Sequence, residues 1–140
     1  MNEQGRIISI SGGLYTVKTS DDTVCCFAKG AFRKSGIRPV AGDLVQISSD
    51  EGLGQKEKEQ GARGVITEIL PRKNVLIRPP LANLDTLFLV AAVKDPEPVL
   101  LSIDKLLSIT QHNDIETVLV FTKKELDPLR AEELCTLYRN

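Results

Sequence analysis

Short runs in which apolar and polar residues alternate fill the first half of the chain, and turn pairs such as Gly12-Gly13 and Asp21-Asp22 separate them. Alternation points successive side chains to opposite faces, so each run predicts a half-buried β-strand. The absence of helical periodicity then predicts a small closed barrel of the oligonucleotide-binding (OB) type, with an SH3-like barrel as the nearest alternative. The five predicted strands cover residues 5–11, 14–20, 23–28, 44–48 and 65–70.

A polar connection joins the fourth and fifth predicted strands. Residues 52–61 alternate Lys and Glu among several glycines. Such a segment has little apolar surface to bury and so gains little from adopting one structure. The connection is therefore predicted to be a mobile hairpin loop.

The second half of the chain changes to longer apolar runs and a helical period. Residues 87–93 are apolar at consecutive positions, as in a strand buried between two helix layers, and residues 117–121 form a second strand of this kind. Between them, residues 99–111 carry apolar side chains at helical spacing. Asp127-Pro128 supplies a cap and a first-turn proline for another helix. This order predicts the opening half of a parallel-sheet α/β domain.

Two domains of different charge are predicted on either side of Pro79-Pro80, because no helix can run through that pair. Residues 1–80 carry 12 Lys and Arg against 9 Asp and Glu, whereas residues 81–140 carry 6 against 10. The chain has 140 residues, enough for one ordinary domain or two small ones. We therefore expect a basic barrel, residues 1–80, and an acidic α/β part, residues 81–140, with different partners.

The sequence predicts a cytoplasmic protein that is not bound to a membrane. The first residues show no signal-peptide pattern, and the longest apolar run, residues 87–93, is too short to span a bilayer. Three cysteines, Cys25, Cys26 and Cys135, fit neither a disulfide framework nor a zinc site. Reduced cysteines that fill small sites in the fold are expected instead.

The connection after the third predicted strand is a candidate RNA-binding segment. Positive charge neutralises phosphates, and an aromatic ring offers a platform on which an unpaired base can stack. The alternative is a solvated loop whose rings belong to the core. The candidate residues are Lys29, Phe32, Arg33, Lys34 and Arg38, with Phe27 close by and no acid between residues 29 and 38.

Residues Thr122, Lys123, Lys124 and Glu125 form a candidate nucleotide site, because they follow a strand at the end where open α/β sheets bind ligands. A carboxylate accepts from the N1–H and exocyclic amine of guanine, two donors that adenine does not present together, and a lysine stem can cover the flat base. A solvated lysine-rich turn is the alternative. No phosphate loop of the form G-x-x-x-x-G-K-[ST] occurs in the sequence.

Several segments, in their order and spacing, resemble the N-terminal part of the ribosome-small-subunit-dependent, circularly permuted GTPases of bacteria (the RsgA, or YjeQ, family). The resemblance covers nearly the whole chain. The segments that carry it are residues 40–45 (Val-Ala-Gly-Asp-Leu-Val), 64–72, 76–79 and 82–90, and the strand that ends in Thr122-Lys123.

The resemblance implies an N-terminal fragment of a GTPase that assists late maturation of the 30S subunit. The OB barrel would lie on 16S rRNA, and residues 81–140 would begin a P-loop-type GTPase domain that is truncated before its phosphate loop. GTP or GDP with Mg²⁺ would be bound by the full-length protein, and zinc by its C-terminal part. The 140 residues alone are then expected to be inactive, with no catalytic residue or metal site.

One residue departs from the family pattern. The guanine-reading turn of the family ends in Asp, whereas this chain has Glu125, whose longer side chain carries the carboxylate further out. Guanine selectivity at this turn is therefore in question. A non-enzymatic RNA-binding or assembly adaptor remains the alternative function.

Overall fold

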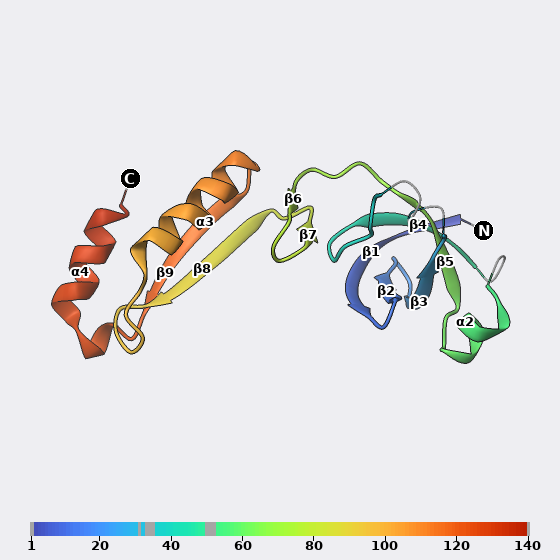
Figure 1. The fold of residues 1–140 in the computed structure, drawn as a ribbon, viewed down its shortest axis with the longest axis horizontal. Helices are drawn as coiled ribbons and strands as arrows, with labels where there is room; N and C mark the ends of the chain where they lie inside the picture. Colours follow the sequence, from blue (N-terminus) through green and yellow to red (C-terminus); the bar gives the residue numbers. More distant parts are fainter. Residues whose placement is uncertain (1, 31, 33–35, 50–52, 140) are drawn as a thin grey trace. The chain divides into compact units, whose positions relative to one another are not determined.

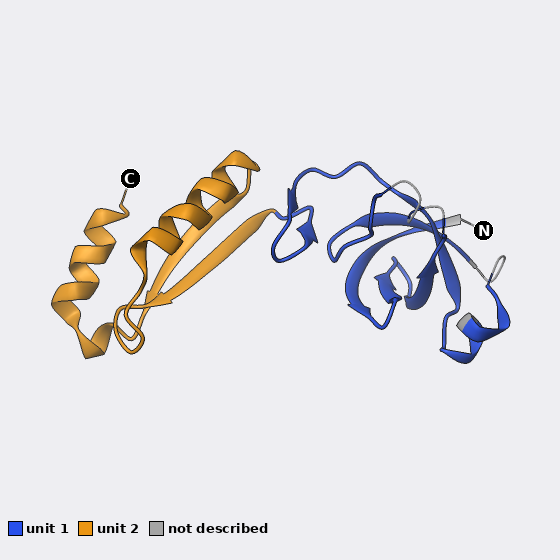
Figure 2. Cartoon of the chain, viewed as in Figure 1, with its two compact units in different colours: residues 1–84 blue, residues 85–140 orange. Residues whose placement is uncertain are grey.

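The computed structural model describes residues 2–30, 32, 36–49 and 53–139. The chain divides into two compact units, Met1–Leu84 and Asp85–Asn140 (Figure 2). Each unit has its own buried cluster of apolar side chains. The two units are therefore considered separately below.

The first unit contains a closed five-stranded barrel in the order β1-β2-β3-β5-β4 (Figure 1). Neighbouring strands are antiparallel except for β3 and β5, which run parallel. This closure is the Greek-key order of an OB barrel, so the predicted fold class is confirmed over the SH3-like alternative. The strands are β1 (Asn2–Ser11), β2 (Leu14–Lys18), β3 (Thr23–Ala28), β4 (Leu44–Ser49) and β5 (Gly64–Ile69).

The barrel core consists of the inward-facing residues of the alternating pattern. Six side chains are at most a few per cent exposed: Ile7, Val17, Cys26, Val45, Ile47 and Ile66. Burial, with smaller contributions from neighbouring Cys25 and Glu3, raises the pKa of the Cys26 thiol to about 12. Cys26 therefore stays a neutral apolar side chain, as expected for a cysteine that fills a small core site.

The connection between β4 and β5 contains a short helix, α2 (Gln55–Glu59), where the sequence predicted a hairpin loop. That prediction was wrong for the described part of the segment, residues 53–61. Gln, Lys and Glu all have high helix propensity, and glycines at positions 54 and 61 flank the turn. Residue 52, the first of the predicted loop, lies outside the described part of the chain.

A fully buried carboxylate, Asp43, lies in the loop that leads into β4. Arg72 donates to it twice, from Nε to Oδ1 at 2.7 Å and from Nη2 to Oδ2 at 2.9 Å, and the backbone N–H of Val40 donates to Oδ2 at 2.8 Å. The bond to Asp43 raises the pKa of Arg72. The loop before β4 and the segment after β5 are thus joined by a charge-assisted pair.

The segment after β5 folds back on the barrel as a small hairpin of β6 (Val75–Leu76) and β7 (Leu81–Ala82). It is anchored by backbone and amide contacts: the N–H of Ala82 donates to the Ala41 carbonyl at 2.9 Å, and Asn83 Nδ2 donates to the Gly42 carbonyl at 3.0 Å. Gly42 has a φ of 90°, and a Cβ at this position would lie 2.0 Å from the Ala82 oxygen. Only glycine fits here.

The second unit is a two-stranded parallel sheet with helices (Figure 1). Strands β8 and β9 pair in unbroken register, from Thr86 opposite Glu116 to Ala92 opposite Thr122. A helix crosses between them, as parallel strands require. In chain order the elements are β8 (Thr86–Ala92), α3 (Leu100–His112), β9 (Glu116–Thr122), the 3₁₀ turn η1 (Lys124–Leu126) and α4 (Pro128–Leu137).

Both helices pack on the same face of this sheet. Thr117 of β9 donates from its hydroxyl to that of Thr110 on α3 at 2.7 Å, and the Phe121 ring lies 6.0 Å from that of Tyr138 after α4. Tyr138 in turn donates to Asp104 of α3 at 2.8 Å. Burial and this bond raise the pKa of Tyr138.

The opposite face of the sheet is open, although the sequence predicted strands buried on both faces. Phe88 and Val90 of β8 are 66% and 60% exposed, and Val118 of β9 is 37% exposed. These residues alternate with the ones under the helices, so they point the other way. The apolar residues on both faces of β8 and β9 predict a layer of helices on each face, whereas the described residues form a helix layer on one face only.

We predict that Gly42→Ala destabilises the first unit by more than about 3 kcal/mol, because the new methyl group overlaps the Ala82 carbonyl. Gly61→Ala is the matched control: its φ is 88° but no atom lies within 4 Å of the added Cβ, so only the roughly 1–2 kcal/mol cost of the left-handed backbone applies. Urea denaturation followed by circular dichroism measures both. Equal losses would show that the close approach to Ala82 is unimportant.

We also predict that Arg72→Leu lowers the free energy of unfolding by about 3 kcal/mol, because it leaves the Asp43 carboxylate buried without its cation. The control, Arg130→Leu, removes an Arg–Glu133 pair whose side chains are 43% and 67% exposed. It should cost less than about 0.5 kcal/mol. A loss for Arg72→Leu as small as that of the control would contradict the prediction.

Candidate functional site

The turn after β9 lies where the carboxyl ends of two parallel strands meet. The Thr122 carbonyl accepts the N–H of Val93 at 3.0 Å, and the Thr122 hydroxyl reaches the Ala91 carbonyl at 3.4 Å. Both contacts hold the end of β9 against the end of β8. The first residue of the predicted nucleotide site is therefore fixed by the sheet itself.

Lys123 turns the chain out of the strand. Its backbone is left-handed, with φ 57° and ψ 33°, and its ammonium donates to the backbone carbonyl of Asp95. Asp95 follows β8 and also has a positive φ, of 50°. The lysine stem thus crosses from the end of β9 to the loop after β8, and it forms part of the surface at this end of the sheet.

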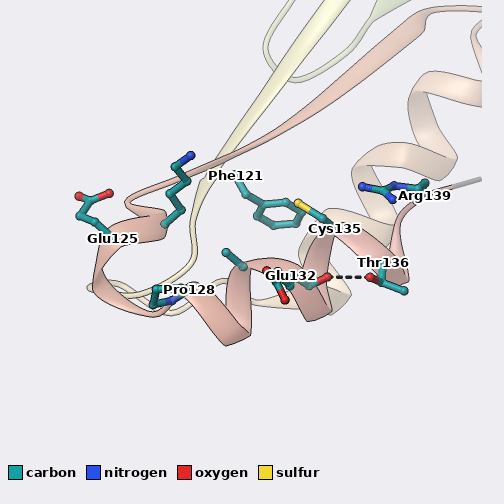
Figure 3. Close-up of a pocket in the computed structure, with 9 residues that line it drawn as sticks. Phe121, Glu125, Pro128, Glu132, Cys135, Thr136 and Arg139 are labelled. Carbon is teal, nitrogen blue, oxygen red and sulfur yellow. Dashed lines mark hydrogen bonds between the residues drawn. The ribbon is translucent and has the colours of Figure 1, made fainter.

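Lys124 and Glu125 lie on the single turn η1 with exposed side chains. In Figure 3 Glu125 points away from Phe121 and Cys135. Among the interactions of the described residues, its carboxylate has no hydrogen bond or ion pair. It is therefore free to accept hydrogen bonds from a ligand beyond the turn.

Asp127 ends the turn and starts the next helix. Its carboxylate accepts the N–H of Arg130 at 3.1 Å as the N-cap of α4, and Pro128 occupies the first helical position, as the sequence predicted. Lys94 after β8 lies 3.7 Å from the same carboxylate. The conformation of the turn is thus set from both sides, by the sheet and by the helix cap.

A hollow of about 730 Å³ lies between β9 and α4, here called the β9 pocket (Figure 3). Lys124 and Glu125 border it, but Thr122 and Lys123 do not. The four predicted residues are therefore consecutive in the turn without converging on one cavity. The pocket is lined by Phe121, Lys124, Glu125, Pro128, Ala131, Glu132, Cys135, Thr136 and Arg139.

A second hollow, of about 370 Å³, lies at one end of the barrel and is called the barrel pocket. Of the predicted RNA-binding residues, it contains Lys29, Phe32 and Arg38, while Arg33 and Lys34 lie outside the described part of the chain. Tyr15 also lines this pocket, and no local pattern predicts it, because only pairing of β2 with β3 brings it there. The full lining is Gly13, Tyr15, Phe27, Ala28, Lys29, Phe32, Ile37, Arg38 and Pro39.

The described residues contain neither a membrane span nor a cluster of metal ligands. None of their helices has the length and apolar character needed to cross a membrane. Nowhere among them do three or more His, Cys, Asp or Glu side chains gather closely enough to hold a metal ion.

Comparison with known proteins identifies both parts of the chain. The model of the RsgA N-terminal domain matches residues 4–54, and the model of the RsgA GTPase matches residues 69–140. The matches follow one another in the same order as the two compact units. The second match alone spans more than half of the chain.

Curated relatives and solved structures agree with these matches. The small ribosomal subunit biogenesis GTPases RsgA of Caldanaerobacter subterraneus and Carboxydothermus hydrogenoformans are each 38% identical over 97% of this chain, which covers 43% and 44% of their lengths. The crystal structure of YjeQ from Thermotoga maritima superimposes with a TM-score of 0.76 at 32% identity, over 97% of this chain and 48% of that one. The crystal structure of YloQ, a circularly permuted GTPase, superimposes with a TM-score of 0.71 at 28% sequence identity, and the match covers 98% of this chain and 47% of that one. The chain thus spans less than half the length of the proteins it matches.

Proposed function

Because this chain belongs to the RsgA family, we propose that it forms the N-terminal part of a GTPase that assists late maturation of the small ribosomal subunit. The observation that carries the proposal is the pair of consecutive family matches, which assign the barrel and the α/β unit to the same kind of protein. The curated relatives are named for this role. Such a protein works where ribosomal subunits are assembled, in the cytoplasm.

The turn after β9 is proposed to read the guanine base. Glu125 would accept from N1–H and the exocyclic amine, and its exposed carboxylate has no competing partner among the described residues. The Lys123 stem, held across the sheet end by the Asp95 carbonyl, would cover the base. Thr122 and Lys124 would complete the turn that presents these two groups.

Hydrolysis needs groups that residues 1–140 do not contain. A phosphate loop and Mg²⁺ place the β- and γ-phosphates for attack, and the sequence has no G-x-x-x-x-G-K-[ST] segment. We therefore expect the purified 140-residue chain to release no phosphate from GTP. Turnover that is lost in Lys123→Ala would overturn this expectation.

The barrel is proposed to contact 16S rRNA in the 30S subunit. Lys29 and Arg38 at the barrel pocket, with Arg33 and Lys34 between them in the sequence, carry four positive charges in a connection without acids. Such charge attracts phosphates regardless of base sequence, and contact with the subunit would place the GTPase on its target.

We predict that Glu125→Asp tightens GDP binding by the complete gene product and increases its preference over ADP. A shorter carboxylate makes both contacts to the base edge without folding back, and paired charge-assisted bonds are worth on the order of a few kcal/mol. Titration with fluorescent GDP at fixed Mg²⁺ measures this. Glu133→Asp, on α4 and outside the β9 pocket, is the control and should leave both affinities unchanged. Weaker GDP binding by Glu125→Asp would mean that the turn is adapted to Glu or does not read the base.

We further predict that RNA binding by the chain depends steeply on salt and that replacing Lys29 and Arg38 together by Gln flattens the dependence. Each lost contact to a phosphate of single-stranded RNA should reduce the slope of log affinity against log salt by about 0.7. The matched control replaces Lys56 and Lys58 of α2 by Gln, which removes the same charge from the same unit. The same slope for both double variants would place the RNA contact elsewhere.

A further inference from the structure

Half of the aromatic residues in the chain surround one small space. The sequence has six Phe and Tyr residues and no Trp, and three of the six line the barrel pocket. Tyr15 comes from β2, Phe27 from the end of β3, and Phe32 from the connection that follows. All three are only partly buried, so each ring keeps some surface open.

Core packing accounts for only part of this gathering. The buried barrel cluster is made of Ile, Val and Cys side chains, and Tyr15 and Phe32 pack against its outside. Phe27 pairs with Leu14, and Tyr15 pairs with the buried Cys26, so the side chains of Phe27 and Tyr15 point to opposite faces of the two strands. A hollow of about 370 Å³ remains beside Tyr15 and Phe32, which is in the size range of small-molecule sites, roughly 300–1,000 Å³.

Lys29 and Arg38, the two cationic residues that line the pocket, have backbone groups held by hydrogen bonds. The N–H of Lys29 donates to the Ile66 carbonyl of β5 at 3.4 Å, and the N–H of Phe32 donates back to the Lys29 carbonyl at 3.1 Å. The Arg38 carbonyl accepts from Nη2 of Arg72 at 2.8 Å. No Asp or Glu is among the described residues that line the pocket. The pocket therefore joins flat apolar surfaces with positive charge.

We propose that the barrel pocket binds a single unpaired nucleobase of RNA, stacked on Tyr15 and Phe32, while Lys29 and Arg38 hold its flanking phosphates. A base presents a flat π-surface and an anionic backbone, which are the two chemistries that the pocket offers. A base within a duplex is already stacked on both sides and cannot enter. This inference rests on the proposed contact of the barrel with RNA, and it adds that the contact includes one splayed-out base.

The test uses the 140-residue chain and a short single-stranded RNA that carries one 2-aminopurine. Stacking on a ring quenches this fluorescent base, so binding should lower its emission. Tyr15→Leu keeps an apolar side chain but removes the flat ring, and it should weaken binding about tenfold and abolish the quenching. Affinity for an RNA duplex should not change. Tyr15→Phe, which keeps the ring, should restore both signals.

The control variant is Phe88→Leu, which removes an exposed ring from the second unit and should leave RNA binding unchanged. Quenching by the unaltered chain needs no variant and so tests the proposal even if Tyr15→Leu fails to fold. Single-stranded RNA that binds with the expected salt dependence but without quenching, or that binds equally well to Tyr15→Leu, overturns the base pocket and leaves the proposed RNA contact standing. No binding to any RNA, or binding of a peptide instead, overturns both.

Discussion

Asp43 carries a charge that solvent does not reach, so the protein must satisfy its oxygens itself. Two donors of Arg72 and the N–H of Val40 do so, and they join segments that are 29 residues apart. The loop that contains Asp43 also holds the β6–β7 hairpin. The carbonyls of Ala41 and Gly42, next to Asp43, accept hydrogen bonds from Ala82 and Asn83. The chain that leaves the barrel is thus held by a loop whose own position depends on the carboxylate.

The order of strands and helices could be predicted from the sequence because it depends on local period. Alternation marked the barrel strands, and consecutive apolar residues marked β8 and β9, within two residues of their limits except at the start of β1, which begins three residues earlier than predicted. Elements that depend on distant partners could not be predicted this way. The β6–β7 hairpin has only two residues in each strand and exists because Ala82 and Asn83 dock on the loop before β4. Charge alternation among glycines is typical of loops, so it does not predict helix α2, although Gln, Lys and Glu favour a helix.

In the turn after β9, too, local features could be predicted and contacts between distant residues could not. Its residue types and the cap at Asp127 were visible in consecutive positions of the sequence, because both are local features. The partner of Lys123 was not, since Asp95 lies 28 residues earlier and meets it only through the parallel register of β8 and β9. The barrel pocket likewise combines Tyr15 with Arg38 from segments that only strand pairing brings together. The sequence thus indicates which kinds of side chain such a site contains, whereas the pairing of strands decides which residues lie together in it.

The two sheets differ in what they offer to another chain. Every strand of the closed barrel has two neighbours, so its backbone N–H and C=O groups are satisfied along both sides and no edge is left for strand addition. In the described residues of the second unit, β8 and β9 have one neighbour each, and both present a free edge beside the apolar face of Phe88 and Val90. Edges of this kind recruit further strands. We therefore expect any self-association of residues 1–140 through strand edges to involve β8 and β9 rather than the barrel.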